Sequence, residues 1–192
     1  MKTIILGITG ASGAFYARRL LDLLEKAGTE VHVIITENGA ELLREELHLA
    51  EVTPLTLLDR NSPLVHFHDN STLRDPLASG SNPVDAMVVC PCSSHTLAAI
   101  AGGLANSLLL RAAYVSLKER RPLLLVHRET PVTAIDLENM LRVSRAGGLI
   151  CPAAPPFYLN PRSIGELVDA FLARILDLLH IEHDLPVRWA PD

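Results

Sequence analysis

The sequence of residues 3–13 is TIILGITGASG, and this stretch decides the class of fold. A short apolar run, Thr3–Ile8, leads into a glycine-rich turn, and a helical pattern of apolar residues follows. Glycines here let the backbone approach an anion closely, and the helix start offers unpaired N–H groups. The spacing G-x-x-G-x-x-G differs from the dinucleotide pattern G-x-G-x-x-G. The stretch therefore predicts a phosphate or ligand at the first strand-to-helix turn, with an unliganded tight turn as the alternative.

The remaining chain alternates strands with helices. Further strands are predicted at Glu30–Ile35, residues 64–65, residues 86–90, Leu123–His127 and residues 149–151. The first predicted helix follows the glycine turn, and its residues 15, 20, 21, 23 and 24 form one buried face. Further helices are predicted at residues 38–49, 94–102, 107–120, 133–146 and 163–179. Asn38 is the expected N-cap of its helix, and residues 53–83 are expected to form long loops around one weak strand. This alternation predicts a doubly wound α/β fold of Rossmann or flavodoxin type, with a mostly parallel sheet and helices on both faces.

Length and composition limit the class of protein. A chain of 192 residues fits one domain, so residues 1–192 are expected to form a single ligand-binding domain with the tail from about residue 180 in subunit contacts. The apolar share of 48% fits a filled core together with surfaces buried between subunits. A net charge of −5 argues against nucleic acid as the main partner. No apolar run reaches the roughly 18 residues of a membrane span, and the three cysteines favour a reduced, cytoplasmic protein.

A second strand-to-helix turn, residues 90–96, is rich in hydroxyl groups. Ser93, Ser94 and Thr96 could donate to a phosphate at a helix start, and His95 is most simply an ordinary residue of that turn. Thr36 ends the second strand, where a hydroxyl suits a phosphate or ribityl contact, although the adjacent acidic residue leaves NAD open.

Metal ligation is not favoured by the sequence. Cys90 and Cys92 are too close together for the usual zinc spacing, and no second Cys/His pair follows them. The sequence His66-x-His68-Asp69 lacks an evident distant third ligand. We therefore predict no metal site.

Arg128 and Glu129 directly follow a predicted strand at the ligand-binding edge of the sheet. A carboxylate beside an arginine normally stays ionised, but a buried one could act as an acid or base. The other cations of this half, such as Arg111 and Lys118, could equally form a solvated helix face.

Seven motifs occur in order and together resemble those of the UbiX-type flavin prenyltransferases. They are TGASG at 9–13, ASGS at 78–81, CPCS at 90–93, KERRPL at 118–123, RExP at 128–131, LENML at 137–141 and PAAPxFY at 152–158. The resemblance covers nearly the whole chain. It implies a metal-independent enzyme that joins a dimethylallyl group from dimethylallyl phosphate to N5 and C6 of reduced FMN. The product, prenylated FMN, would serve UbiD-type decarboxylases, and the enzyme would be a homododecamer with active sites at subunit junctions.

The resemblance also implies roles for individual residues. The FMN-binding set is Gly10, Ala11, Ser12, Thr36, Ser93, Ser94, His95, Thr96 and Arg111. The set for the phosphate of the donor is Lys118, Arg128, Tyr158 and Arg174, and the groups that assist the chemistry are Ser12, Glu46 and Glu129. Cations around a departing phosphate stabilise its growing charge without a metal ion. His95, Asn82 and Leu73 depart from the residues common in the family, which puts the shape of the prenyl pocket in question.

Two other readings remain open at the level of sequence. A flavin-dependent cysteine decarboxylase of related fold would need a histidine near its first helix, and residues 13–27 contain none. A non-catalytic FMN-binding subunit would need the flavin contacts but not the second phosphate site.

Overall fold

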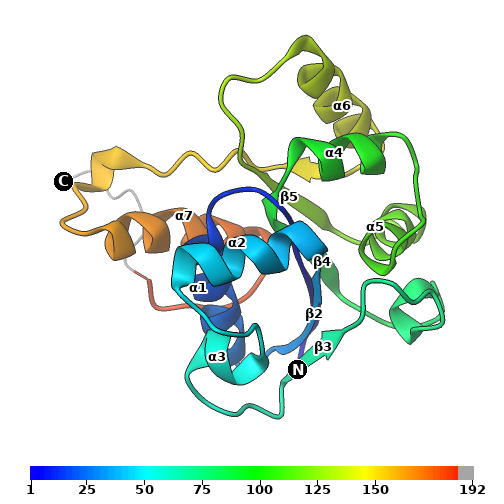
Figure 1. Cartoon of the computed structure of the whole chain (residues 1–192). Helices are drawn as coiled ribbons and strands as arrows, with labels where there is room; N and C mark the ends of the chain where they lie inside the picture. The colour runs from blue at the N-terminus through cyan, green and yellow to red at the C-terminus, as the bar shows by residue number, and fades with distance from the viewer. Residues whose placement is uncertain (186–192) are drawn as a thin grey trace.

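The computed structural model describes residues 1–185 and contains one six-stranded parallel sheet (Figure 1). The strand order is β3-β2-β1-β4-β5-β6. The strands are β1 (Thr3–Ile8), β2 (Glu30–Ile35), β3 (Val65–His68), β4 (Ala86–Cys92), β5 (Leu123–His127) and β6 (Leu149–Ile150). All five pairings are parallel, so the predicted doubly wound fold is confirmed.

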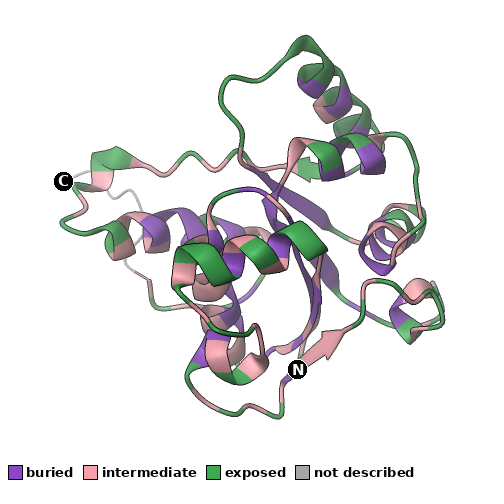
Figure 2. Cartoon of the chain, in the orientation of Figure 1, coloured by how far each residue is buried: buried purple, intermediate pink, exposed green. Residues whose placement is uncertain are grey.

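Helices cover both faces of the sheet. They are α1 (Ala14–Lys26), α2 (Glu37–Leu47), α3 (Pro54–Leu58), α4 (Ser94–Ala101), α5 (Leu108–Lys118), α6 (Ala134–Arg145) and α7 (Ile164–Leu178), with 3-10 turns η1 (Pro76–Ala78) and η2 (Phe157–Leu159). One apolar cluster joins α1, α2, α3 and α7 to one face, and a second joins α4, α5 and α6 to the other. In Figure 2 the central strands are buried between these layers. Every residue of β4 is buried, as expected for a parallel strand covered on both sides.

Three local predictions were wrong: the N-cap of α2, the irregular character of residues 53–83, and the burial of Phe15. The N-cap of α2 is Thr36, not Asn38, because the Thr36 hydroxyl accepts a hydrogen bond from the N–H of Gly39 at 3.1 Å. The region 53–83 is more ordered than predicted, since α3 begins at a reciprocal capping box between Thr53 and Thr56. Phe15 was placed on the buried face of α1 but is 42% exposed.

The strand order creates a switch point between β1 and β4. From β1 the chain goes to β2 and β3 on one side, and from β4 it goes to β5 and β6 on the other. The two predicted turns therefore meet at this point. The Thr9 hydroxyl joins them directly, because it donates to the Pro91 carbonyl at 2.8 Å and accepts from the Ser93 N–H at 2.9 Å. Among residues 1–185, no helix has the length and apolar character to cross a bilayer.

Candidate active site

A cavity of about 360 Å³ opens at the switch point between β1 and β4. Five predicted flavin-binding residues line it, namely Gly10, Thr36, Ser93, His95 and Thr96. The lining also includes Asn70, Asn106 and Ser107, which the sequence analysis did not single out. Asn70 follows β3 by two residues and caps α5, because its side-chain oxygen accepts from the N–H of Leu109 at 2.9 Å. Its position just beyond a strand end was the available sequence signal.

The start of α4 presents free N–H groups beside this cavity. Ser93 is the N-cap, and its hydroxyl accepts from the N–H of Thr96 at 3.2 Å and donates to the Thr96 hydroxyl at 3.1 Å. The backbone N–H groups of Ser94 and His95 have no protein acceptor within residues 1–185. These backbone donors, rather than the serine hydroxyls, are the groups that can bind an anion.

The start of α1 is already occupied by a carboxylate of the chain itself. Glu46 Oε2, from α2, accepts from the N–H groups of Gly13 at 2.9 Å and Ala14 at 2.8 Å. Burial acts to raise the pKa of Glu46, but these two hydrogen bonds, the Ser12 hydroxyl and the charge of Arg128 lower it overall. Glu46 is therefore held as an ionised group, and the glycine turn does not leave its helix start free for a phosphate.

The glycine turn is closely packed against the start of α2. A Cβ atom on Gly10 would lie 2.6 Å from the Cβ of Asn38, so a larger residue would displace α2. Ala11 is buried and its N–H donates to the Thr9 carbonyl at 2.8 Å, whereas Ser12 is exposed. Gly10 is thus the predicted residue whose identity the geometry explains most directly.

The Ser94 side chain points away from the cavity, into a buried polar cluster. Its hydroxyl lies 3.1 Å from Nε2 of His127, and it hydrogen-bonds the carboxylate of Asp136. His127 and Asp136 are 3% and 6% exposed. Burial lowers the pKa of His127, while hydrogen bonds from Thr133 and Ser94 lower that of Asp136. The cluster ties the start of α4 to the end of β5 and the start of α6, and the sequence analysis missed His127 and Asp136.

Arg128 contains a buried donor without a partner. Its Nε has no hydrogen-bond partner within the described residues, while its backbone N–H donates to the Cys92 carbonyl at 3.2 Å. The charge of Arg128 contributes to the lowered pKa of Glu46, so the two groups lie near enough for their charges to interact. Glu129 is exposed and accepts from the N–H of Thr130 at 3.0 Å. A buried guanidinium nitrogen without an acceptor within residues 1–185 is a donor that an anion could satisfy.

Tyr158 and Arg174 line a second cavity of about 320 Å³. Cys151, Phe171 and Asp177 also contribute to its wall, and Arg174 Nη1 lies 3.6 Å from Asp177 Oδ2. The side chain of Arg174 is 69% exposed, so this ion pair is weak. Burial raises the pKa of the Cys151 thiol to about 11, which makes it a poor nucleophile.

Lys118 does not join the other site residues within one chain, whereas Arg111 lies in the first turn of α5, next to residues that line the switch-point cavity. Arg111 Nε donates to the Ala78 carbonyl at 2.9 Å, and Lys118 forms an ion pair with Glu119 at 2.7 Å. Lys118 ends α5 at the amino edge of the sheet, whereas Arg128 follows β5 at the carboxyl edge. The length of one strand, on the order of 15 Å, separates these edges. We call residues 78–81, Arg111 and Lys118 the α5 flank.

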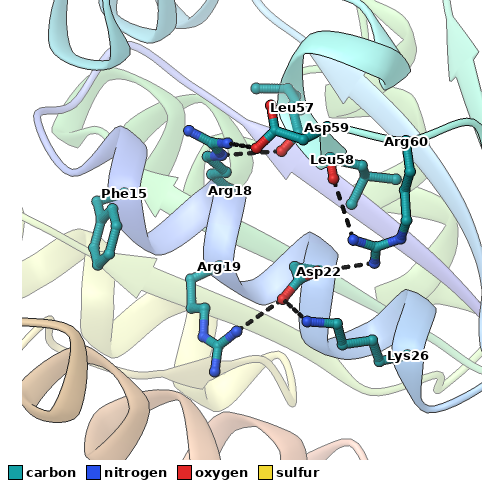
Figure 3. Close-up of a pocket in the computed structure, with 9 residues that line it drawn as sticks. All are labelled: Phe15, Arg18, Arg19, Asp22, Lys26, Leu57, Leu58, Asp59 and Arg60. Carbon is teal, nitrogen blue, oxygen red and sulfur yellow. Dashed lines mark hydrogen bonds and ion pairs between the residues drawn. The ribbon is translucent and has the colours of Figure 1, made fainter.

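Another cavity, of about 420 Å³, lies between α1 and α3 and contains none of the predicted site residues (Figure 3). Its cations are paired within the chain: Arg60 contacts Asp22 at 2.8 Å, Lys26 contacts Asp22 at 2.9 Å, and Arg18 contacts Asp59. We interpret this network as one that fixes α3 to α1. Within residues 1–185, no group of three His, Cys, Asp or Glu side chains could hold a metal ion.

The fold, the switch-point cavity and the open start of α4 define a phosphate-binding α/β protein, and the family model described as Flavoprotein matches residues 1–176. The chain belongs to the flavin prenyltransferase UbiX family. The flavin prenyltransferase UbiX of Methanothermobacter thermautotrophicus is 47% identical over 189 residues, which cover 98% of this chain and 96% of that protein. The family inferred from the seven motifs is thus confirmed.

Solved structures agree with this family. The crystal structure of AnUbiX (PadA1) with FMN and dimethylallyl pyrophosphate has a TM-score of 0.91, at 37% identity and with 99% of this chain and 98% of that chain covered. The dodecameric FMN-dependent UbiX-like decarboxylase of Escherichia coli O157:H7 has a TM-score of 0.88, at 37% identity with 98% and 100% covered. The cysteine decarboxylase TvaF is only 17% identical, with a TM-score of 0.63 over 94% and 99% of the two chains, so it shares the fold alone.

Proposed function

We propose that this enzyme transfers a dimethylallyl group from dimethylallyl phosphate to N5 and then C6 of reduced FMN. FMN would occupy the switch-point cavity, with its phosphate at the start of α4. The prenylated FMN would then pass to a decarboxylase of the UbiD type. Membership of the family and the binding of FMN and dimethylallyl pyrophosphate by a 37% identical relative support this proposal.

The buried Nε of Arg128 is the observation that carries the proposal for this chain. A guanidinium group binds phosphate through paired, planar N–H donors, and an unsatisfied buried donor is costly. Arg128 also follows β5 at the carboxyl edge of the sheet and acts electrostatically on Glu46, which binds the start of α1. A donor phosphate at Arg128 would satisfy the free Nε and bring the prenyl group beside the cavity proposed for the flavin.

The transfer requires charge stabilisation and proton movement. Forming the bond to N5 breaks the bond between the prenyl carbon and the phosphate oxygen. The phosphate leaves with the electron pair, and the proton that N5 carried is lost to a base, which the departing phosphate can itself provide. Arg128, Arg174, Tyr158 and Lys118 would stabilise that charge. The flavin supplies the electron-rich atoms N5 and C6. Closure at C6 adds a C–H bond across the remaining alkene, so one proton must leave C6 and one must reach the alkene carbon.

Glu129 and Glu46 are the proposed groups for these proton movements. Glu129 is exposed at the exit of β5, where its carboxylate accepts only from the adjacent N–H of Thr130 among the described residues. Glu46 is fixed in ionised form by the start of α1, which suits a group that holds Ser12 and Arg128 in position. We therefore assign proton transfer to Glu129 and orientation to Glu46 and Ser12.

Lys118 would act in the site of a neighbouring copy. The separation of Lys118 from Arg128 leaves a single chain without the full set of cations. The dodecameric relative supports an assembly in which the α5 flank of one copy meets Arg128 of another. A cytoplasmic location belongs to the same proposal, and the three free thiols Cys90, Cys92 and Cys151 support it. Subunit contacts of the tail from about residue 180 also remain a prediction, and residues 186–192 lie outside the described part.

Reconstitution tests the reaction. Purified protein given FMN, a reductant and dimethylallyl phosphate should yield a flavin heavier by one prenyl unit in mass spectrometry. A parallel reaction with a geranyl-length donor measures selectivity. Recovery of only unmodified FMN with both donors would exclude the proposed function.

Mixed oligomers test the shared site. Co-assembly of Lys118→Ala with Arg128→Ala should restore activity in a fraction of sites, because each inactive copy supplies the group that the other lacks. Co-assembly of Arg128→Ala with Glu46→Gln is the matched control. Both of those residues come from the same chain, so no site would regain the full set. Equal recovery in both mixtures would contradict the shared arrangement.

A further inference from the structure

The two histidines of the His66-x-His68 motif have separate partners. His66 Nε2 faces Glu30 at 3.3 Å near the sheet edge. His68 Nε2 lies 2.8 Å from Nδ1 of His32, and His68 Nδ1 lies 2.6 Å from Oδ2 of Asp75. The side chains of His68 and Asp75 are only 17% and 13% exposed. His68 is therefore a largely buried bridge between β2 and the segment that follows β3.

The hydrogen bonds assign the proton between His68 and Asp75. Burial acts to raise the pKa of Asp75, but the N–H of Leu77 and the His68 side chain lower it overall, so Asp75 is ionised and can only accept. His68 must then carry a proton on Nδ1 and donate it to Asp75. Nε2 of His68 shares its hydrogen bond with Nδ1 of His32, and burial is the chief cause that lowers the pKa of His32. The nearby titratable groups are Glu30, His66, His68 and Asp75.

Asp75 connects this bridge to the α5 flank. Its other oxygen accepts from the N–H of Leu77 at 2.9 Å and caps η1. The last residue of η1, Ala78, offers the carbonyl that accepts from Arg111 Nε at 2.9 Å. Beyond it, Arg121 donates to the Gly80 carbonyl at 2.7 Å and to the Asn82 carbonyl at 2.9 Å. The segment is thus held by His68 at its start, Arg111 in the middle and Arg121 at its end.

The same segment approaches Lys118 closely at Gly80. A Cβ atom on Gly80 would lie 3.1 Å from Lys118 Nζ and 2.3 Å from Glu119 Oε1. The backbone at Gly80 thus lies close to the ends of both side chains, beside their ion pair. The positions of Arg111 and Lys118 depend on where the segment begins.

We propose that His68 is a positioning residue for the α5 flank, an inference that rests on the proposed roles of Arg111 and Lys118. Its Nδ1–H holds the Asp75 carboxylate, which fixes η1 and the carbonyl acceptor of Arg111. Loss of this donor leaves a half-buried carboxylate short of one partner and lets η1 shift. Arg111 and Lys118 would then lose the fixed geometry that binding of a phosphate group requires.

Three variants separate positioning from general stability. His68→Leu removes the donor, His68→Asn places an amide N–H near the position of Nδ1, and His66→Leu alters the neighbouring histidine on the same strand. The dissociation constant of FMN is measured by flavin fluorescence, and KM and kcat are measured by mass spectrometry of the prenylated product. His68→Leu should raise the FMN dissociation constant and the donor KM by about tenfold, with kcat changed by less than about threefold. His68→Asn should recover most of both losses, and His66→Leu should stay within about twofold of the wild type.

Unchanged FMN binding and donor KM in His68→Leu would overturn the proposal, as would equal losses in His66→Leu. If His68→Leu folds poorly, Asp75→Ala removes the same link from outside the sheet and must show the same increases. The reaction itself is judged separately on the wild type. If wild-type protein forms no prenylated flavin, the FMN-binding measurements still compare His68→Leu with its controls.

Discussion

Helices α1 and α4 both begin at the carboxyl edge of the sheet, next to the switch point, yet their N-termini face different partners. The N–H groups at the start of α1 bind the carboxylate of Glu46. The N–H groups of Ser94 and His95 at the start of α4 have no acceptor within residues 1–185. Both helix ends carry the same partial positive charge, so they differ only in whether the chain itself supplies an acceptor for their N–H groups.

This contrast assigns different tasks to the two turns. The first turn binds an internal anion, the carboxylate of Glu46, which interacts with Ser12 and with the charge of Arg128. The second turn leaves its donors for an external anion, which we propose to be the FMN phosphate. A glycine-rich turn is therefore not by itself a phosphate site, because a side chain from elsewhere in the fold can occupy it.

Removal of Arg128 should have the largest effect, because its backbone contacts the second turn at Cys92 and its charge acts on Glu46 at the first. Arg128→Ala should lower kcat/KM for the donor by about 10³-fold, since a charged phosphate partner is lost in a partly buried site. Arg128→Lys should recover only part of the activity, because an ammonium group lacks the planar pair of donors. Steady-state kinetics with limiting donor measure both, and Arg142→Ala on the exposed side of α6 is the control. Activity of Arg128→Ala within tenfold of the wild type would contradict the phosphate assignment.

Glu46→Gln should remove the internal anion while keeping the shape of the side chain. We expect kcat/KM to fall by about 10²-fold as Ser12 and Arg128 lose their charged partner. The free energy of unfolding should fall by about 1 kcal/mol, a value kept small by the exposure of the side chain. Urea titration measures this change.

The stability difference between wild type and Glu46→Gln should depend on pH. The pKa of Glu46 in the folded protein lies below its ordinary value of 4.5, so the folded state binds this proton less tightly than the unfolded chain. The stabilisation by Glu46 is therefore complete above that value and is lost as pH falls through the folded pKa. If the stability difference stays constant down to strongly acidic pH, the charge of Glu46 does not stabilise the start of α1.

Ser93→Ala should weaken the second turn without affecting the first. Loss of the N-cap of α4 should raise the FMN dissociation constant by about tenfold and cost about 1 kcal/mol of stability. Ser163→Ala is the matched control, because Ser163 caps α7 by accepting from the N–H of Glu166 at 3.1 Å. The control should lose similar stability with no change in FMN affinity. Equal FMN affinities in the two variants would place the flavin phosphate elsewhere.

Local sequence patterns predicted the sheet and the two turns, because strand and helix periods and glycine positions are properties of neighbouring residues. They could not predict that the Glu46 carboxylate binds the N–H groups at the start of α1, because this contact forms only when α2 packs beside α1. One signal was available but not used. Lys118 ends a helix and Arg128 follows a strand, and in a parallel α/β fold these ends lie at opposite edges. Only the family resemblance placed them in one site, and a site that holds both would need a second copy of the chain.

Ser94→Ala should give the smallest effect on flavin binding and so sharpen the contrast between backbone and side-chain donors. The Ser94 hydroxyl is directed to His127 and Asp136, while only its backbone N–H is directed to the anion site. We expect the FMN dissociation constant to change by less than about threefold, since the backbone donor is retained. The free energy of unfolding should fall by about 1–3 kcal/mol, because two buried polar groups lose a partner. Flavin fluorescence and urea titration measure the two quantities, and a loss of FMN affinity as large as that of Ser93→Ala would show that the hydroxyl itself contacts the ligand.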